Sequence, residues 1–201
     1  MKDIFLTDRS ESGLWTMTRA DDDSLVAACN GADADAATAA FEALYRRHRN
    51  YVLRVALRFT HDRELAADVL QETFTYLLGQ FPPPGRGLTL TARLTTYLYP
   101  IAKNFAISAA RKAERFDSGD RDPDSYAHAE ARSMHGDEID RALAALTVER
   151  REVLTLRFVD GMSLAEISDA LQIPAGTVKS RLHLALKQLK ETPEIKDLFD
   201  A

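Results

Sequence analysis

The sequence predicts an all-α protein of two small helical domains joined by an acidic linker. First, apolar residues recur at helical spacing in successive segments, which capping residues or Pro and Gly separate. Second, the stretch 117–137 is rich in Ser, Gly and Asp, and Asp117 to Asp140 contains eight acids but only two arginines. Third, 201 residues with 45% hydrophobic and 28% charged content are typical of a soluble globular protein with one or two cores.

These patterns predict five parts. They are an N-terminal arm (1–22), a first domain of three to four helices (23–116), the acidic linker (117–137), a four-helix domain (138–192) and a C-terminal tail (193–201). The arm shows no strong periodicity, so we expect it to be mobile.

The first domain is expected to hold a bundle. Asp23 or Ser24 can cap a short helix that ends near Gly31, and Asp62 can cap a later one. Between them, one long segment keeps its apolar side chains on one face: Phe41, Leu44, Tyr45, Tyr51, Val52, Val55, Ala56 and Phe59. His48 lies on this face and is expected to be a packed core histidine.

The last helix of this domain contains Pro100, so either the regular helix starts just before it or the helix is kinked there. From Lys103 to Arg115 it carries four cations and one acid, and Tyr97 and Tyr99 precede them. Rings interleaved with cations and an amide, here Asn104, suit unpaired bases. A helical bundle with a solvated basic face explains the same residues, and both interpretations stay open.

Residues 163–190 predict a helix-turn-helix. Ser163 and Glu166 form a capping-box pattern, Ile173–Gly176 breaks the chain, and Pro174 suits the first turn of a new helix. From Gly176 to Lys190 there are four cations and no acid. This pattern is typical of a DNA-recognition helix, although an ordinary helical hairpin with a basic face is the alternative.

The net charge of −5 does not exclude nucleic acid. Residues 1–40 hold three cations and eight acids, which accounts for the whole excess, and the acidic linker concentrates a second block. The residues outside these two acidic segments form two basic regions, one on each side of the linker. The sign of the local charge, rather than the net charge of the chain, decides whether a surface attracts phosphate.

Other classes of protein lack support. No apolar run is long enough to span a bilayer and no signal-peptide core is present, so we expect a cytoplasmic protein. A single cysteine, Cys29, excludes an internal disulfide, and five histidines show no ligand spacing, so no metal or other cofactor is expected. Asp68 and Glu72 share a helix face without a nucleophile or phosphate loop, so no enzymatic activity is expected.

Two groups of motifs resemble a known family. FEALYRRHRNYVLRVALRFT, ADVLQETFTYLL and YLYPIAKNFAISAARKAER resemble the second conserved region of bacterial sigma factors, and ALAALTVERREVLTLRFVDGMSLAEISDALQIPAGTVKSRLHLALKQLK resembles their fourth region. A short linker between the two is similar to the extracytoplasmic-function (ECF) type. The resemblance covers roughly residues 24 to 192.

The resemblance implies three sets of site residues. The set matching the contact with the polymerase clamp is Asp68, Gln71, Glu72 and Phe74, although Phe74 also suits the core. The set near the promoter minus-10 strand is Tyr97, Lys103, Asn104, Arg111 and Arg115. The set facing the minus-35 element is Thr177, Lys179, Ser180, Arg181, His183 and Lys187. Two departures are Tyr97, where many relatives carry Trp, and Leu184, where a basic residue is common.

The implied function is that of a transcription initiation factor. Its implied partners are core RNA polymerase, through the largest-subunit clamp and the flap, promoter DNA, and an anti-sigma protein. The acidic linker is expected to lie in a positively charged polymerase channel. The alternative is a stand-alone helix-turn-helix regulator, which would need a receiver, a ligand pocket or a dimer seam in the first domain.

Overall fold

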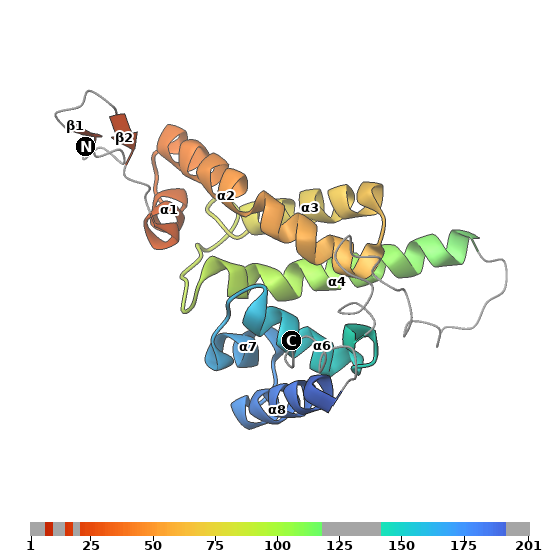
Figure 1. Ribbon diagram of the computed structural model, residues 1–201. Coiled ribbons are helices and arrows are strands. Elements are labelled where there is room, and N and C mark those ends of the chain that lie inside the picture. The colour runs from red at the N-terminus through yellow and green to blue at the C-terminus, as the bar shows by residue number, and fades with distance from the viewer. Residues whose placement is uncertain (1–6, 10–14, 18–20, 118–141, 192–201) are drawn as a thin grey trace.

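The chain folds into a stack of helices with one short hairpin at its N-terminal end (Figure 1). The structure is a computed structural model that describes residues 7–9, 15–17, 21–117 and 142–191. Its elements are β1 (Thr7–Arg9), β2 (Trp15–Met17), α1 (Asp22–Cys29), α2 (Ala34–Thr60), α3 (Arg63–Leu78), α4 (Leu94–Asp117), α6 (Val148–Phe158), α7 (Leu164–Leu171) and α8 (Ala175–Glu191). Residues 142–144 are also helical. The all-α prediction is confirmed, while the linker after Asp117 and the C-terminal tail lie outside the described residues.

The N-terminal arm was expected to be mobile, but six of its residues form two short β-strands. Strands β1 and β2 pair antiparallel, with Thr7 opposite Met17 and Arg9 opposite Trp15. Three-residue strands are too short for an alternating pattern to stand out from the sequence.

Side-chain caps fix where the helices begin. Asp33, Asp62 and Thr147 each accept a hydrogen bond from a backbone N–H in the first turn of α2, α3 and α6. The capping box of Ser163 and Glu166 at α7 is present as predicted. The predicted cap of α1 was wrong by two or three residues: Asp21, rather than Asp23 or Ser24, accepts from the Ser24 N–H at 2.8 Å.

Replacing a cap tests this account of the helix ends. Asp62 Oδ1 accepts from the N–H groups of Glu64 and Leu65 at 2.7 and 2.9 Å. Asp62→Ala is expected to lower the free energy of unfolding by about 0.5–2 kcal/mol, measured by urea denaturation. Asp68→Ala in the middle of the same helix is the control and should change stability by less than about 0.5 kcal/mol. Equal losses in both variants would contradict the capping role.

The N-terminal unit, residues 21–117, is a bundle in which α2 packs against α1, α3 and α4. Leu44, Val52 and Val55 of α2 are fully buried. Phe41 and Tyr45 make edge-to-face contacts with Phe74 of α3, with ring centroids 6.3 and 4.8 Å apart. His48 is buried as predicted, and its Nε2 lies 2.9 Å from a carboxylate oxygen of Asp22, at the first turn of α1.

Helix α4 begins six residues before Pro100 and includes it. The proline therefore lies in the second turn, where it offers no N–H to the carbonyl of Thr96. Of the two predicted alternatives, a regular helix that starts just before the proline is wrong, because α4 includes the six residues ahead of it. Leu94 and Leu98, which lie in this part of α4, are fully buried, and their burial stabilises it.

The C-terminal unit, residues 142–191, contains the predicted helix-turn-helix. Helix α7 ends at Leu171 and is capped by Gln172, which takes the left-handed conformation at φ 54°, and α8 begins at Ala175. Gly176 therefore lies inside α8 rather than in the turn. Val178 and Ala185 of α8 are buried, and they hold the helix against the rest of the unit.

The two units pack against each other through α4 and α7 (Figure 1). One apolar cluster runs from Leu98, Tyr99 and Ala102 of α4 into Met162 and Ile167 of the C-terminal unit. This contact positions the basic face of α4 next to α6 and α7, which matters for the sites described below.

Candidate nucleic-acid and polymerase interfaces

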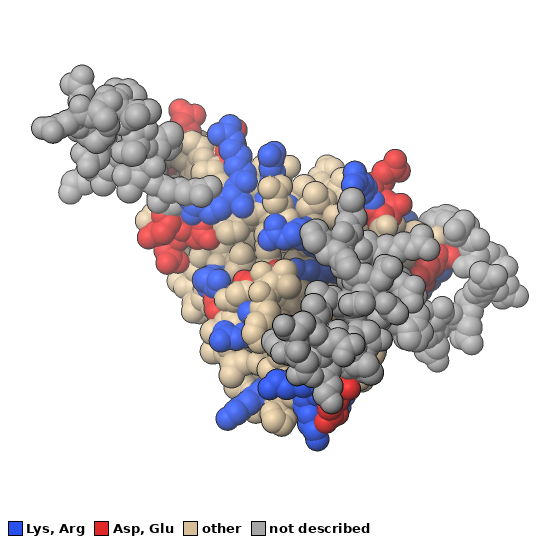
Figure 2. Space-filling model, viewed as in Figure 1, with Lys and Arg blue, Asp and Glu red and all other residues tan. Residues whose placement is uncertain are grey.

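The first candidate site is the outward face of α8. Lys179, Ser180, His183 and Lys187 are exposed, while Thr177 and Arg181 are half-buried. Figure 2 shows Lys and Arg side chains gathered along the lower edge of the molecule, where Figure 1 places α8. The six residues predicted to face the minus-35 element therefore all lie on one helix, and most of them are open to solvent.

Neighbouring contacts set the orientation of α8. Arg150 of α6 donates to Gln188 Oε1 at 2.9 Å, and Gln188 Nε2 donates to the carbonyl of Ala145 at 2.8 Å. Lys187 Nζ lies 4.0 Å from a carboxylate oxygen of Glu191, and both side chains are more than half exposed, so this pair is weak. Leu184 is 42% exposed and presents an apolar surface among the polar residues.

The second candidate site is α4. Asn104, Arg111 and Arg115 are exposed, and Tyr97 is half-buried, which raises the pKa of its phenol. Lys103 is only 26% exposed: its Nζ donates to Glu152 Oε1 at 2.5 Å and lies 5.8 Å from the centre of the Phe59 ring. Of the five predicted minus-10 residues, three are therefore exposed and two are half-buried, and one of these two, Lys103, is paired with an acid of the C-terminal unit.

Tyr99 does not offer an open stacking ring. It is 1% exposed, and its hydroxyl donates to Glu152 Oε1 at 2.6 Å. Burial, with the Glu152 carboxylate as a second cause, raises its pKa far above the ordinary range. The interpretation of Tyr99 as a ring that stacks on unpaired bases is therefore wrong for this arrangement, because the C-terminal unit covers it.

Two further ion pairs join the units, and neither was predicted from the sequence. Arg58 of α2 makes two hydrogen bonds to Asp160, at 2.7 and 2.8 Å, and the Asp160 side chain is fully buried. Arg93, just before α4, donates to both carboxylate oxygens of Glu166 and to the carbonyl of Gly161. The hydrogen bonds from Arg93 lower the pKa of Glu166 to about 2, so this carboxylate stays ionised at neutral pH. These partners are 68 to 102 residues apart, and no local spacing connects them.

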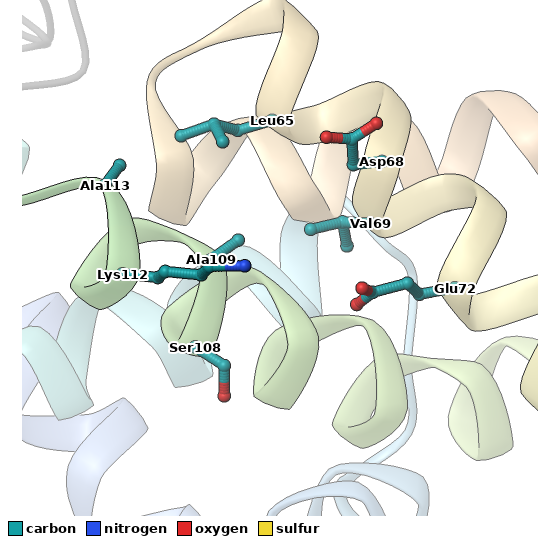
Figure 3. A pocket seen from close by; sticks show the side chains of 8 residues that line it. All are labelled: Leu65, Asp68, Val69, Glu72, Ser108, Ala109, Lys112 and Ala113. Atoms are coloured by element: carbon teal, nitrogen blue, oxygen red, sulfur yellow. The ribbon is translucent and has the colours of Figure 1, made fainter. Parts of the chain in front are cut away.

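The third candidate site is a groove between α3 and α4 with a volume of about 310 Å³ (Figure 3). Its floor is apolar, formed by Leu65, Val69 and Ala109, while Asp68 and Glu72 come from α3 and Lys112 from α4. Gln71 is exposed beside these acids. A groove that presents two carboxylates above an apolar floor suits a basic, amphipathic helix of another protein.

Phe74 does not share this surface. It is 4% exposed and packs among the aromatic rings of α2, so direct contact with a partner is not open to it. Phe74 lies on the inward face of α3 together with Thr73 and Leu77, which are also buried. Of the four residues predicted to meet the polymerase, Asp68, Gln71 and Glu72 lie on the surface.

Metal and membrane sites can be checked over the part of the chain that the structure describes. There, no three His, Cys, Asp or Glu side chains lie in a group that could hold a metal ion. None of the helices in the same part combines the length and the apolar character that crossing a bilayer requires.

Comparisons with known proteins agree on one family. Residues 44–116 match the family described as Sigma-70 region 2, and residues 136–189 match Sigma-70, region 4. The ECF RNA polymerase sigma factor SigL of Mycobacterium tuberculosis is 37% identical over 167 residues, which cover 79% of this chain and 92% of the relative. The RNA polymerase sigma-H factor of Pseudomonas aeruginosa is 32% identical over 165 residues, 73% of this chain and 82% of the relative.

Solved structures show the same fold. CnrH, in complex with the cytosolic domain of CnrY, has a TM-score of 0.56 at 22% identity, covering 85% of this chain and 96% of CnrH. The sigma factor RpoE of Bartonella quintana, in complex with the anti-sigma factor NepR, has a TM-score of 0.56 at 23% identity, covering 77% and 97%. Matches to both sigma regions, in order, do not support the stand-alone regulator that the helix-turn-helix by itself left open. The chain belongs to the ECF family of RNA polymerase sigma factors.

Proposed function

We propose that this ECF sigma factor binds core RNA polymerase, directs it to specific promoters and promotes opening of the minus-10 region. The observation that carries the proposal is the presence of both sigma regions in one chain, in the order 2 then 4, each with its candidate surface exposed at least in part. In this function the chain has no catalytic residue of its own and acts in the cytoplasm.

The three surfaces divide the work. Helix α8 enters the major groove of the minus-35 element, where a recognition helix reads duplex DNA. Helix α4 binds the minus-10 strand after the strands part; flipping a base costs a few kcal/mol, which stacking of about 1–3 kcal/mol per base can offset. The groove between α3 and α4 docks on the clamp of the polymerase largest subunit, and the C-terminal unit meets the flap.

An anti-sigma protein is a further proposed partner. Both solved neighbours named above are complexes: one holds the cytosolic domain of CnrY and the other the anti-sigma factor NepR. Their shared fold supports a similar inhibitor for this chain.

Replacing cations of α8 tests the minus-35 surface. Arg181→Ala and Lys187→Ala are each expected to weaken promoter binding by the holoenzyme. Each should also reduce the slope of log K against log salt by about one unit per lost phosphate contact. Filter binding or fluorescence anisotropy at several salt concentrations measures this slope.

The matched control is Arg46→Ala. Arg46 is an exposed arginine on α2 whose ion pair is with Glu42, one turn away on the same helix. Its replacement should leave the slope unchanged. If Arg46→Ala and the α8 variants change the slope equally, α8 is not the surface that contacts the promoter.

Co-elution with core polymerase tests the proposed function as a whole. In size-exclusion chromatography, the purified chain mixed with core polymerase is expected to elute at the volume of the polymerase. The chain run alone should be absent from that volume. Binding of operator DNA by the free chain, together with no affinity for the polymerase, would contradict the proposal.

A further inference from the structure

The basic face of the N-terminal unit is paired with acids of the C-terminal unit. Three cations take part: Arg58 near the end of α2, Arg93 just before α4, and Lys103 within α4. Their partners are three acids of the C-terminal unit: Asp160, Glu166 and Glu152 respectively. Each cation of this set therefore has one carboxylate from the other unit, and the pairs cross the same interface.

The geometry of these pairs matches what phosphate would offer. Arg58 holds Asp160 through two parallel hydrogen bonds, and Arg93 holds both oxygens of Glu166. Arginine binds carboxylate and phosphate through this same forked geometry. A carboxylate that occupies such a cation excludes a phosphate from it.

One of the three cations already belongs to a proposed DNA surface. Lys103 lies beside Asn104, the residue proposed to read the minus-10 strand, and Tyr99 is buried below it by the same contact with Glu152. With the C-terminal unit in this place, a strand laid along α4 meets Glu152 instead of Lys103. Closure of the units and full access to α4 are therefore mutually exclusive.

We infer that the structure is a closed state of the sigma factor, in which Glu152, Asp160 and Glu166 take the place of nucleic-acid phosphates on Arg58, Arg93 and Lys103. When the units separate, Arg58 and Arg93 join Lys103 in holding the backbone of the single strand. The proposed function supplies only the identity of the ligand; the closure itself depends on the contacts between the units.

The contact between the two units is weak enough to open and close reversibly. The free-energy cost of removing two charges from water offsets much of the attraction between them. Ion pairs of this kind therefore stabilise a contact only modestly. The apolar part of the interface, around Tyr99, Met162 and Ile167, adds to it. Salt screens partly exposed pairs, and Lys103 and Arg93 are 26% and 48% exposed. Raising the salt concentration is therefore expected to favour the open state of the free protein.

Two triple variants of the full chain separate this inference from a purely structural interface. The acid variant is Glu152→Gln, Asp160→Asn and Glu166→Gln, and the cation variant is Arg58→Gln, Arg93→Gln and Lys103→Gln. All of the acid changes are isosteric, and glutamine still completes the capping box at Ser163. The matched control is Glu42→Gln, which removes an ion pair within α2 alone.

The first readout is the distance between the units, measured by double electron–electron resonance. Spin labels are placed on Thr75→Cys in α3 and Lys190→Cys in α8, both exposed positions, after the buried Cys29 is replaced by Ala. Both triple variants should give a longer mean distance between the labels and a broader distance distribution than the labelled protein without these changes, whereas Glu42→Gln should not. Unchanged distances in both variants, with native circular dichroism and melting, would overturn the closed state.

The second readout is binding of a fluorescein-labelled, mixed-sequence 20-nucleotide single strand at low salt, followed by anisotropy. The acid variant frees three cations, so it should bind about tenfold more tightly than the wild type, with a salt slope steeper by about two units. The cation variant opens equally but should bind no more tightly than the wild type. If both variants open and bind the strand alike, the three cations do not hold nucleic acid and the inference fails.

Exchanging the two charges of one ion pair distinguishes loss of the contact between the units from poor folding of a variant. Lys103→Glu combined with Glu152→Lys should bring the label distance back toward the wild-type value, whereas each single change should lengthen it. Failure of the pair to do so, in a protein that melts like the wild type, would also overturn the inference. None of these readouts uses polymerase or a promoter, so a failure of the proposed function would not be mistaken for a failure of the closed state.

Discussion

Replacing Asp68 and Glu72 with lysine is expected to weaken binding to core RNA polymerase by about 30-fold or more. The two carboxylates stand over the groove between α3 and α4, which is the proposed docking surface for the clamp. Reversing charges at a desolvated, complementary interface typically costs about 2–5 kcal/mol, and 1.4 kcal/mol is a factor of ten. Competition against a labelled wild-type sigma factor for core polymerase measures the change.

Glu42→Lys provides the matched control. Glu42 is an exposed acid of α2 that does not line the groove, and its replacement makes the same change in net charge as either groove substitution made alone. It should leave polymerase affinity within about twofold of the wild type. Equal losses in both proteins would show that overall charge, rather than the groove, governs docking.

Replacing Asn104 with alanine is expected to leave promoter recognition intact but to reduce strand opening by about 5- to 150-fold. Asn104 is exposed on α4, and its amide can read the edge of an unpaired base. A stacking or bidentate base contact is worth about 1–3 kcal/mol, which sets this range. Permanganate reactivity of minus-10 thymines measures opening, while anisotropy on the duplex minus-35 element measures recognition.

The control for Asn104 is an asparagine outside the three proposed surfaces. Asn50→Ala makes the same change at an exposed position of α2 and should leave permanganate reactivity unchanged. A loss of duplex binding in Asn104→Ala equal to its loss of opening would remove the proposed division of labour between α4 and α8.

The helices themselves could be predicted well because their signals are local. Caps such as Asp62 and Ser163 and the inward stripe of α2 act within one or two turns, so the spacing of residue types is enough. The same holds for the outward residues of α8, whose exposure follows from the buried positions of Val178 and Ala185.

Contacts between distant parts of the chain could not be predicted in this way. Tyr99 was interpreted as a ring for stacking on unpaired bases but is buried beside Glu152, and the pairing of Arg58 with Asp160 joins residues 102 positions apart. Tyr99 and Arg58 lie within helices and Asp160 follows the end of α6, and nothing in the local pattern of any of them identifies its partner. Only the packing of α4 against α6 and α7 determines their partners.

The measurement that tests the account most directly is transcription from a genomic library by core RNA polymerase with and without this protein. We expect transcripts that start downstream of a shared pair of minus-35 and minus-10 sequences, that require the protein and that disappear with the Asp68→Lys, Glu72→Lys variant. The account is contradicted if the polymerase yields the same transcripts in the absence of the protein, or if the protein represses promoters without binding the enzyme.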